Sequence, residues 1–274
     1  MRRQRLDHAL VERGLFDSRT SAVEAITAGR VLVAGSVADK SSRQVSPGDP
    51  IVVTGSGPRF VSRGGSKLER GIQAFSVSPV GRTAVDAGSA TGGFTDCLLQ
   101  SGALGVLAVD VGYGQLHEKL RSDARVVSLE RTNIRDVDRQ KACEALSPLP
   151  PPSLVVADLS FTSLRPLVER LLDLSGPEGE LLVLCKPQFE VGRQVAARGK
   201  GVVRDRQDRR GALLDVIATF EGAGATIMGI VSSPILGPAG NAEFIVFASK
   251  VACVSATTVE QMADAALDEA ELLS

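Results

Sequence analysis

A series of short apolar runs, alternating with helical patterns, constrains the fold of this chain more than any other feature. Parallel strands covered by helices on both faces are continuously apolar, so this alternation predicts an α/β domain built on a parallel sheet. The last two runs are joined by SSPILGPAGN, which has no helical pattern, so we expect a hairpin and an antiparallel final strand. The seven runs occupy residues 83–87, 106–109, 126–129, 154–157, 181–184, 226–231 and 244–248.

A smaller basic module precedes this pattern. Residues 1–60 hold nine Lys and Arg against six Asp and Glu, whereas the whole chain has a formal net charge of −1. Two short amphipathic helices are expected, at 5–15 and from Ser18 to Gly29, followed by short extended runs that end at 51–54. We therefore predict a domain at 1–58, a linker at 59–63 and a second domain at 64–274. The excess of basic residues suggests a polyanionic partner for the first domain.

Composition excludes several other classes of protein. A hydrophobic fraction of 43% with 23% charged residues is typical of a globular chain, not of a disordered one. The four cysteines are widely separated, so neither a zinc site nor a disulfide framework is expected. No apolar stretch has the length of a signal peptide or of a membrane span. We expect a cytoplasmic protein without a bound metal and without membrane association.

The first predicted strand runs into a glycine-rich turn, AVDAGSATGGFTD at 84–96. Asp86 ends the strand, Gly88 permits close approach of a ligand to the backbone, and a helix begins near Gly93. The spacing differs from the G-x-G-x-x-G dinucleotide fingerprint. Asp110 ends the next strand, where a carboxylate can hold the ribose hydroxyls of a nucleoside. These residues predict a nucleoside-type cofactor, although glycines at such a turn can also serve packing alone.

Four charged residues are expected to converge at the same edge of the sheet. Asp158 and Lys186 follow apolar strands, and open α/β sheets bind ligands at the carboxyl ends of their strands. If the final strand is antiparallel, Glu243 begins it at that edge, and Lys67 lies on a helix expected at 67–75. A lysine in such a cluster can act as a general base on a hydroxyl group. The alternative is a pair of solvated salt bridges at the rim of the sheet.

The chain resembles the TlyA family of ribosomal RNA 2′-O-methyltransferases, some of which carry the name haemolysin. Residues 5–35 and the segment VSPGDPIVV resemble an S-four-like RNA-binding module. The segments that carry the resemblance to the methyltransferase are VSRGGSKL at 61–68, VDAGSATGGFTD at 85–96, VDVGYGQL at 109–116, LERTNIR at 129–135, VVADLSF at 155–161, CKPQFEVG at 185–192 and GPAGNAEF at 237–244.

The resemblance implies a Rossmann-like class I methyltransferase with a seven-stranded, mostly parallel sheet and a small α+β S-four-like domain. It implies S-adenosylmethionine as cofactor and, as substrate, the ribose of a cytidine in ribosomal RNA of the small subunit, the large subunit or both. It also implies a catalytic tetrad of Lys67, Asp158, Lys186 and Glu243, in which Lys186 helps to remove the 2′-hydroxyl proton. The implied cofactor-binding residues are Asp86, Gly88, Ser89, Gly92, Gly93, Phe94, Asp110, Thr132, Asn133, Asp158, Leu159, Ser160 and Phe161.

Ribosomal RNA and ribosomal subunits are the expected partners, with no obligate protein partner. A second basic stretch at 193–210, with glycines at 199 and 201, predicts a loop near the site. The alternative functions are those of a nicotinamide-dependent oxidoreductase, a membrane-active haemolysin, and an RNA-binding protein with an inactive methyltransferase fold. The residues expected to contact RNA are Arg3, Arg5, Arg19, Arg30, Lys40, Arg63, Arg198, Lys200 and Arg204.

Overall fold

The chain forms two compact units, Met1–Arg59 and Phe60–Ser274, in a computed structural model. The structure describes residues 3–16, 18–27, 29–55, 57–192, 195, 199–251 and 256–273. Phe60, within the predicted linker at 59–63, is buried in the core of the second unit, and the extent of the linker stays a prediction. Among the described residues, no helix is both long and apolar enough to cross a membrane.

The first unit packs two helices against short strands. Its core contains Leu6, Leu10, Ile26 and Val31. The helix predicted at 5–15 ends at residue 12, and Leu15 beyond it is exposed. Two-residue strands β1 and β4 pair with each other, and β2 pairs with β3 and β5 in an antiparallel sheet. The elements are β1 (Gln4–Arg5), α1 (Leu6–Glu12), α2 (Arg19–Thr27), β2 (Val31–Val33), β3 (Ser36–Val37), β4 (Gln44–Val45) and β5 (Ile51–Val53).

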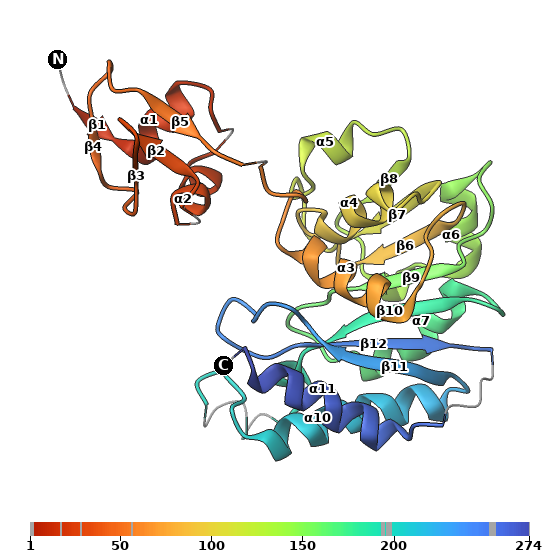
Figure 1. Cartoon of the computed structure of the whole chain (residues 1–274). Helices are drawn as coiled ribbons and strands as arrows, with labels where there is room; N and C mark the ends of the chain where they lie inside the picture. The colour runs from red at the N-terminus through yellow and green to blue at the C-terminus, as the bar shows by residue number, and fades with distance from the viewer. Residues whose placement is uncertain are drawn as a thin grey trace. The chain divides into compact units, whose positions relative to one another are not determined.

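The second unit is built on a seven-stranded sheet of order β11-β12-β10-β9-β6-β7-β8 (Figure 1). Strand β12 pairs antiparallel with both β10 and β11, while the pairs that link β10, β9, β6, β7 and β8 are parallel. The predicted fold class is therefore confirmed. The strands are β6 (Thr83–Ala87), β7 (Gly105–Val109), β8 (Val126–Leu129), β9 (Leu154–Ala157), β10 (Glu180–Cys185), β11 (Thr226–Ser232) and β12 (Phe244–Ser249).

Helices cover both faces of this sheet (Figure 1). Neighbouring residues of one strand, such as Val85 and Ala84, belong to different core clusters because side chains alternate between the faces. Helices α3 (Gly64–Phe75), α4 (Gly93–Gln100) and α5 (Glu118–Arg121) pack on one face. The other face carries α6 (Arg139–Leu146), α7 (Val168–Ser175), α10 (Arg206–Gly222) and α11 (Val259–Glu271). Three short helical turns complete the unit: η1 (Ile134–Asp136), η2 (Arg165–Leu167) and α8 (Pro187–Glu190).

Helix α3 begins at Gly64, three residues before the predicted start. Its first residues lie unusually close to neighbouring atoms: a Cβ on Gly65 would stand 2.3 Å from the ring of Phe60. A Cβ on Gly93, the first residue of α4, would stand 2.9 Å from the backbone nitrogen of Gly65. Glycines here let the amino ends of α3 and α4 meet, which places Lys67 beside the carboxyl edge of the sheet.

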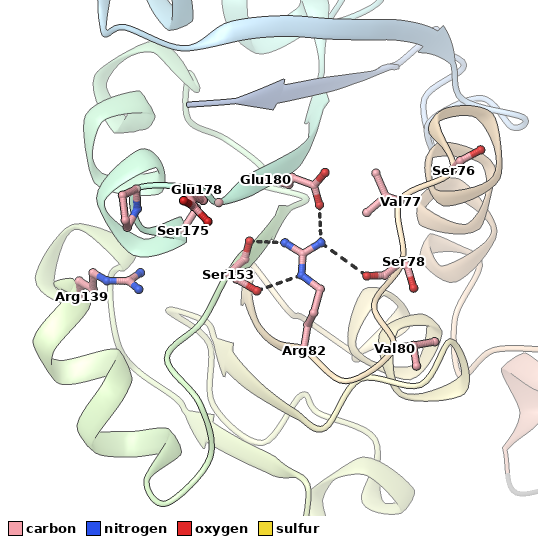
Figure 2. Close-up of a pocket in the computed structure, with 12 residues that line it drawn as sticks. Ser76, Val77, Ser78, Val80, Arg82, Arg139, Ser153, Ser175, Glu178 and Glu180 are labelled. Atoms are coloured by element: carbon pink, nitrogen blue, oxygen red, sulfur yellow. Dashed lines mark hydrogen bonds and ion pairs between the residues drawn. The ribbon is translucent and has the colours of Figure 1, made fainter. Parts of the chain in front are cut away.

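A cavity of about 740 Å³ opens at the opposite, amino-terminal edge of the sheet (Figure 2). Arg82 lies at its centre, and all three guanidinium nitrogens donate hydrogen bonds to protein groups. The acceptors are Ser78, Ser153 and the carboxylate of Glu180. These residues precede or begin β6, β9 and β10, so Arg82 connects the starts of three strands. Because its guanidinium nitrogens all donate to these groups, we assign Arg82 a structural role.

Candidate active site

The glycine-rich turn follows β6 and has a backbone that only glycine adopts easily. Gly88 has φ +84°, and a Cβ there would stand 2.8 Å from the carbonyl oxygen of Asp158. Gly92, with φ +94°, precedes α4. The backbone N–H of Gly88 and that of Ser89 both donate to the carbonyl of Val109, at 2.8 and 3.2 Å. Two residues of this turn, Gly88 and Ala90, line both of two cavities at the carboxyl edge of the sheet.

The first of these cavities has a volume of about 590 Å³ and is suited to a nucleoside. Asp110 lines it, and the two carboxylate oxygens accept hydrogen bonds from the N–H groups of Gly112, at 2.7 Å, and Ala90, at 2.9 Å. The carboxylate is thereby held in one orientation while each oxygen retains a lone pair for a ribose hydroxyl. The predicted residues that line this cavity are Gly88, Asp110, Thr132, Asn133, Asp158, Leu159, Ser160 and Phe161.

The second cavity, of about 340 Å³, brings together all four predicted catalytic residues. Lys67 comes from α3, Asp158 follows β9, Lys186 follows β10 and Glu243 precedes β12. The Nζ of Lys67 lies 2.5 Å from Glu243 Oε2, and the Nζ of Lys186 lies 2.6 Å from Asp158 Oδ1. Lys186 also donates to Ser160 Oγ at 2.9 Å. The two cations and two carboxylates form a nearly neutral, largely buried centre rather than salt bridges in solvent.

The two cavities share Gly88, Ala90, Asp158 and Ser160 as lining residues, so they are direct neighbours. A cofactor whose nucleoside occupies the first cavity can therefore present its other end to the lysines. Ser89, Gly93, Phe94 and Arg63 line the second cavity. The volume of the first cavity lies within the roughly 300–1,000 Å³ typical of small-molecule sites. The cavity, the oriented Asp110 carboxylate and the tight glycine turn together fit S-adenosylmethionine.

Asp86 occupies a different place from the one expected. Its side chain is fully buried beneath the turn and lines neither cavity. Oδ2 accepts a hydrogen bond from the hydroxyl of Thr95 at 2.6 Å, and Oδ1 has no partner among the described residues. Burial raises the pKa of Asp86 to about 7, with the Thr95 hydrogen bond opposing and Asp158 and Asp110 adding to the rise. Asp86 thus supports the turn from below.

Phe161 lies at the rim of the nucleoside cavity and is 93% exposed. Its φ of +61° places it in the left-handed region, which is uncommon for a bulky residue. The ring stands 5.6 Å from that of Phe189, whose own ring lies 5.9 Å from the Nζ of Lys186. The backbone at this position leaves the aromatic ring of Phe161 exposed to solvent near Phe189 and Lys186.

Two buried polar residues beside the site were not predicted. Glu190 accepts hydrogen bonds from Ser163 and Leu164 in the segment that follows Asp158. Asn241 donates to the carbonyl of Gly201 at 2.9 Å and accepts from the N–H of Val203 at 2.9 Å. Asn241 therefore attaches the segment around residue 201 to the loop that carries Glu243. Both residues stand in segments with distinctive motifs, but their partners are too distant in sequence to be found from spacing.

The predicted RNA-binding residues differ in their surroundings. Arg5 and Arg19 both form ion pairs with the buried carboxylate of Asp7, at 3.0 and 2.9 Å, and these pairs lower the pKa of Asp7 well below its usual range. Arg3, Lys40, Arg63, Lys200 and Arg204 are exposed, Arg30 is half-buried, and Arg198 lies outside the described residues.

The basic stretch at 193–210 is less available to RNA than its sequence suggests. Arg206 pairs with Asp268 and Glu271, and Arg210 pairs with Asp264, all on α11. Arg209 is buried and donates to the carbonyl of Val203. Helices α10 and α11 lie side by side, so acidic residues far along the chain neutralise this part of the stretch (Figure 1).

The fold and the paired cavities define an S-adenosylmethionine-dependent methyltransferase with a separate RNA-binding module. Comparison with protein-family models matches residues 60–250 to the FtsJ-like methyltransferases and residues 4–51 to the S4 domain. The chain belongs to the FtsJ-like methyltransferase family, within the group of TlyA proteins. The match to a methyltransferase family argues against the alternative of a nicotinamide-dependent oxidoreductase.

Curated relatives and a solved structure agree with this assignment. The 16S/23S rRNA (cytidine-2′-O)-methyltransferase TlyA of Mycobacterium tuberculosis H37Rv is 43% identical over 247 residues, 90% of each chain. The 23S rRNA (cytidine-2′-O)-methyltransferase TlyA of Campylobacter jejuni is 31% identical over 69% of this chain and 70% of that one. A Streptococcus thermophilus structure, described as a candidate hemolysin, matches with a TM-score of 0.75 and 35% identity, over 99% of this chain and 97% of that one.

Proposed function

We propose that this enzyme transfers a methyl group from S-adenosylmethionine to the ribose 2′-oxygen of a cytidine in ribosomal RNA. The observation that carries the proposal is the centre of two lysine–carboxylate pairs directly beside the cofactor cavity. The substrates named for the M. tuberculosis and C. jejuni relatives support cytidine in ribosomal RNA, in both subunits or in the large subunit alone. The cytoplasm, where ribosomal RNA is available to a soluble enzyme, is the proposed location.

Lys186 is the proposed base for the 2′-hydroxyl. An ammonium has three N–H donors; Lys186 Nζ donates one to Ser160 and forms an ion pair with Asp158. One direction remains for the hydroxyl oxygen of a ribose in the cavity that Lys186 lines. In its neutral form, the same Nζ accepts the hydroxyl proton, while the carboxylate of Asp158 stabilises the resulting ammonium.

Lys67 and Glu243 form the second ion pair of the centre and line the same cavity. Their side chains are only 5% and 1% exposed, so the pair is held in one arrangement by the surrounding protein. Lys67 supplies positive charge near the oxygen as it becomes more nucleophilic, and Glu243 keeps that charge in place. The cofactor, when bound, supplies the electrophilic methyl group. Positioning and electrostatics among these four side chains then account for most of the rate enhancement.

Binding of RNA is assigned to the S4 domain and to exposed cations of both units. Asp7 holds the guanidinium groups of Arg5 and Arg19 close together on the first unit, and two such groups on one carboxylate retain net positive charge. Lys200 and Arg204 flank the segment that Asn241 attaches beside Glu243. Contacts of these cations with phosphates would make binding fall steeply with salt concentration.

A methyl-transfer assay on ribosomal RNA tests the proposal. Small and large subunits from cells that lack the enzyme are incubated with the purified protein and S-adenosylmethionine labelled in the methyl group. The label is then mapped by digestion to nucleosides. The proposal predicts label in 2′-O-methylcytidine. Label on a base, or no transfer by protein that binds S-adenosylmethionine, would contradict it.

A further inference from the structure

A third carboxylate, besides those of Asp158 and Glu243, lies next to the catalytic centre, and its side chain is as deeply buried as that of Glu243. Glu190 ends α8, the helical turn that begins directly after Lys186, and its side chain is 1% exposed. Oε1 accepts the backbone N–H of Leu164 at 2.7 Å, and Oε2 accepts the hydroxyl of Ser163 at 2.5 Å. The guanidinium of Arg165 stands 3.5 Å from Oε2. Ser163 and Leu164 belong to the segment that joins β9 to η2, and Arg165 is the first residue of η2.

This segment, residues 158–164, carries the acidic partner of Lys186. Its first residue, Asp158, donates its backbone N–H to Ala87 at 3.1 Å. In its middle, Ser160 accepts from Lys186, and Phe161 has a strained left-handed backbone and a 93% exposed side chain. Its end is held by Glu190. The turn that begins at Lys186 therefore contacts the segment at two points, once through the lysine and once through Glu190.

The chemistry of Glu190 suits this second contact. A buried carboxylate is costly unless its oxygens are hydrogen-bonded, and here each oxygen has a donor from the segment. Two acceptor oxygens hold the backbone of Leu164 and the side chain of Ser163 at once, which restricts where the preceding residues can lie. The strained backbone at Phe161 needs such support, because strain persists only where surrounding contacts maintain it.

We propose that Glu190 is a positioning residue for methyl transfer: it holds the 158–164 segment so that Asp158 and Ser160 stay within reach of Lys186 Nζ. The inference rests on the proposed role of Lys186. Glu190 touches neither cavity, and it acts through the segment alone.

The test substitutes Glu190→Gln, which keeps the size of the side chain but leaves a single acceptor oxygen for two donors. We expect kcat to fall about tenfold or more, since displacements near 1 Å in reacting groups cost up to about a hundredfold. Affinity for S-adenosylmethionine should fall by a smaller factor than kcat, because Asp110 is untouched although the segment also lines the nucleoside cavity. Glu180→Gln is the matched control: Glu180 also pairs with an arginine that joins elements of the sheet, but at the opposite edge (Figure 2). It should lower stability without lowering kcat.

A second measurement tests the inference without requiring any methyl transfer by the enzyme. Amide hydrogen exchange of residues 159–164, with S-adenosylmethionine present, should be faster in Glu190→Gln than in wild type and unchanged in Glu180→Gln. Unchanged exchange overturns the inference, even if the wild-type enzyme methylates no ribosomal RNA and the proposed function itself fails. Faster exchange with wild-type kcat also overturns it.

A double substitution separates positioning from a general loss of folding. Ser160→Ala removes the hydrogen bond between Lys186 and the middle of the segment and leaves the ion pair with Asp158 in place. If Glu190 acts through that segment, the loss of kcat in the double variant should be smaller than the product of the two single losses. Losses that multiply fully would show that Glu190 acts independently of the segment and would overturn the inference.

Discussion

The pair of Lys67 and Glu243 yields a quantitative prediction that separates stability from catalysis. Glu243→Gln keeps the shape of the side chain but leaves the Lys67 ammonium in a buried site without a counter-charge. Because both side chains are at most 5% exposed and the charged atoms lie 2.5 Å apart, solvent cannot replace the lost partner. Removing one member of a buried pair costs about 3–5 kcal/mol. For a domain of this size that corresponds to a fall in Tm of roughly 6–20 °C.

Urea unfolding followed by circular dichroism measures the cost directly. Arg70→Ala serves as control, because Arg70 pairs with Glu269 at the surface, with side chains 38% and 44% exposed. Its cost should stay below about 1 kcal/mol. The double variant Lys67→Met with Glu243→Gln removes both charges and should recover much of the lost stability while methyl transfer stays abolished.

Two results would refute this reasoning. If Glu243→Gln costs no more than the Arg70→Ala control, the pair is solvated in solution and the centre is not desolvated as its geometry implies. If the double variant regains methyl transfer together with stability, the pair serves folding and has no part in the reaction.

Three further predictions concern the turn, the nucleoside cavity and RNA binding. Burial raises the pKa of Asp86 to about 7, above the value of about 3.9 in unfolded chains, so the folded state retains the proton longer. The free energy of unfolding should therefore fall as pH rises from about 4 to 7, and Asp86→Asn should remove this slope in urea titrations at pH 5 and 8. Asp110→Ala should weaken S-adenosylmethionine binding at least about tenfold by calorimetry, since it removes the ribose contact; unchanged affinity would place the nucleoside elsewhere. Arg19→Ala should lower the slope of log affinity for ribosomal RNA against log salt by about one in filter binding, and an unchanged slope would exclude a phosphate contact.

The sheet of the second unit was predictable because its strands are buried on both faces. Residues such as Val85 and Val155 stand in continuous apolar runs, and these runs leave a local signal that needs no knowledge of the partner strands. The final antiparallel strand was predictable because the connection before it, SSPILGPAGN, has no helical pattern, and a parallel strand needs a crossover that is usually helical. The strands β1 and β4 have two residues each, which is too short for any periodicity to register.

The convergence of the charged residues on one cavity could be predicted because topology alone determines their position. Asp158, Lys186 and Glu243 lie at ends of strands, and the rule that such ends share one edge was enough to bring them together. The start of α3 was missed because Gly64 and Gly65 are poor helix formers, and only their contact with α4 explains them.

Pairing between charged side chains could not be predicted. Arg206 and Arg210 look available in sequence, yet their carboxylate partners lie more than 50 residues away on α11. Arg19 pairs with Asp7 on another helix. Nothing in the sequence distinguishes Glu190 from other acidic residues, because its partners Ser163 and Leu164 are distant along the chain. Such contacts depend on tertiary packing, which spacing along the chain does not encode.

The most direct test of the central claim is the methyl-transfer rate of Lys186→Ala on ribosomal RNA, measured beside its affinity for S-adenosylmethionine. The cofactor cavity is lined by other residues, so affinity should change by less than about threefold. Transfer should fall by about 10²–10⁴-fold, as expected for the loss of a general base. Near-wild-type turnover by Lys186→Ala, with normal cofactor binding, would contradict the assignment of the catalytic centre.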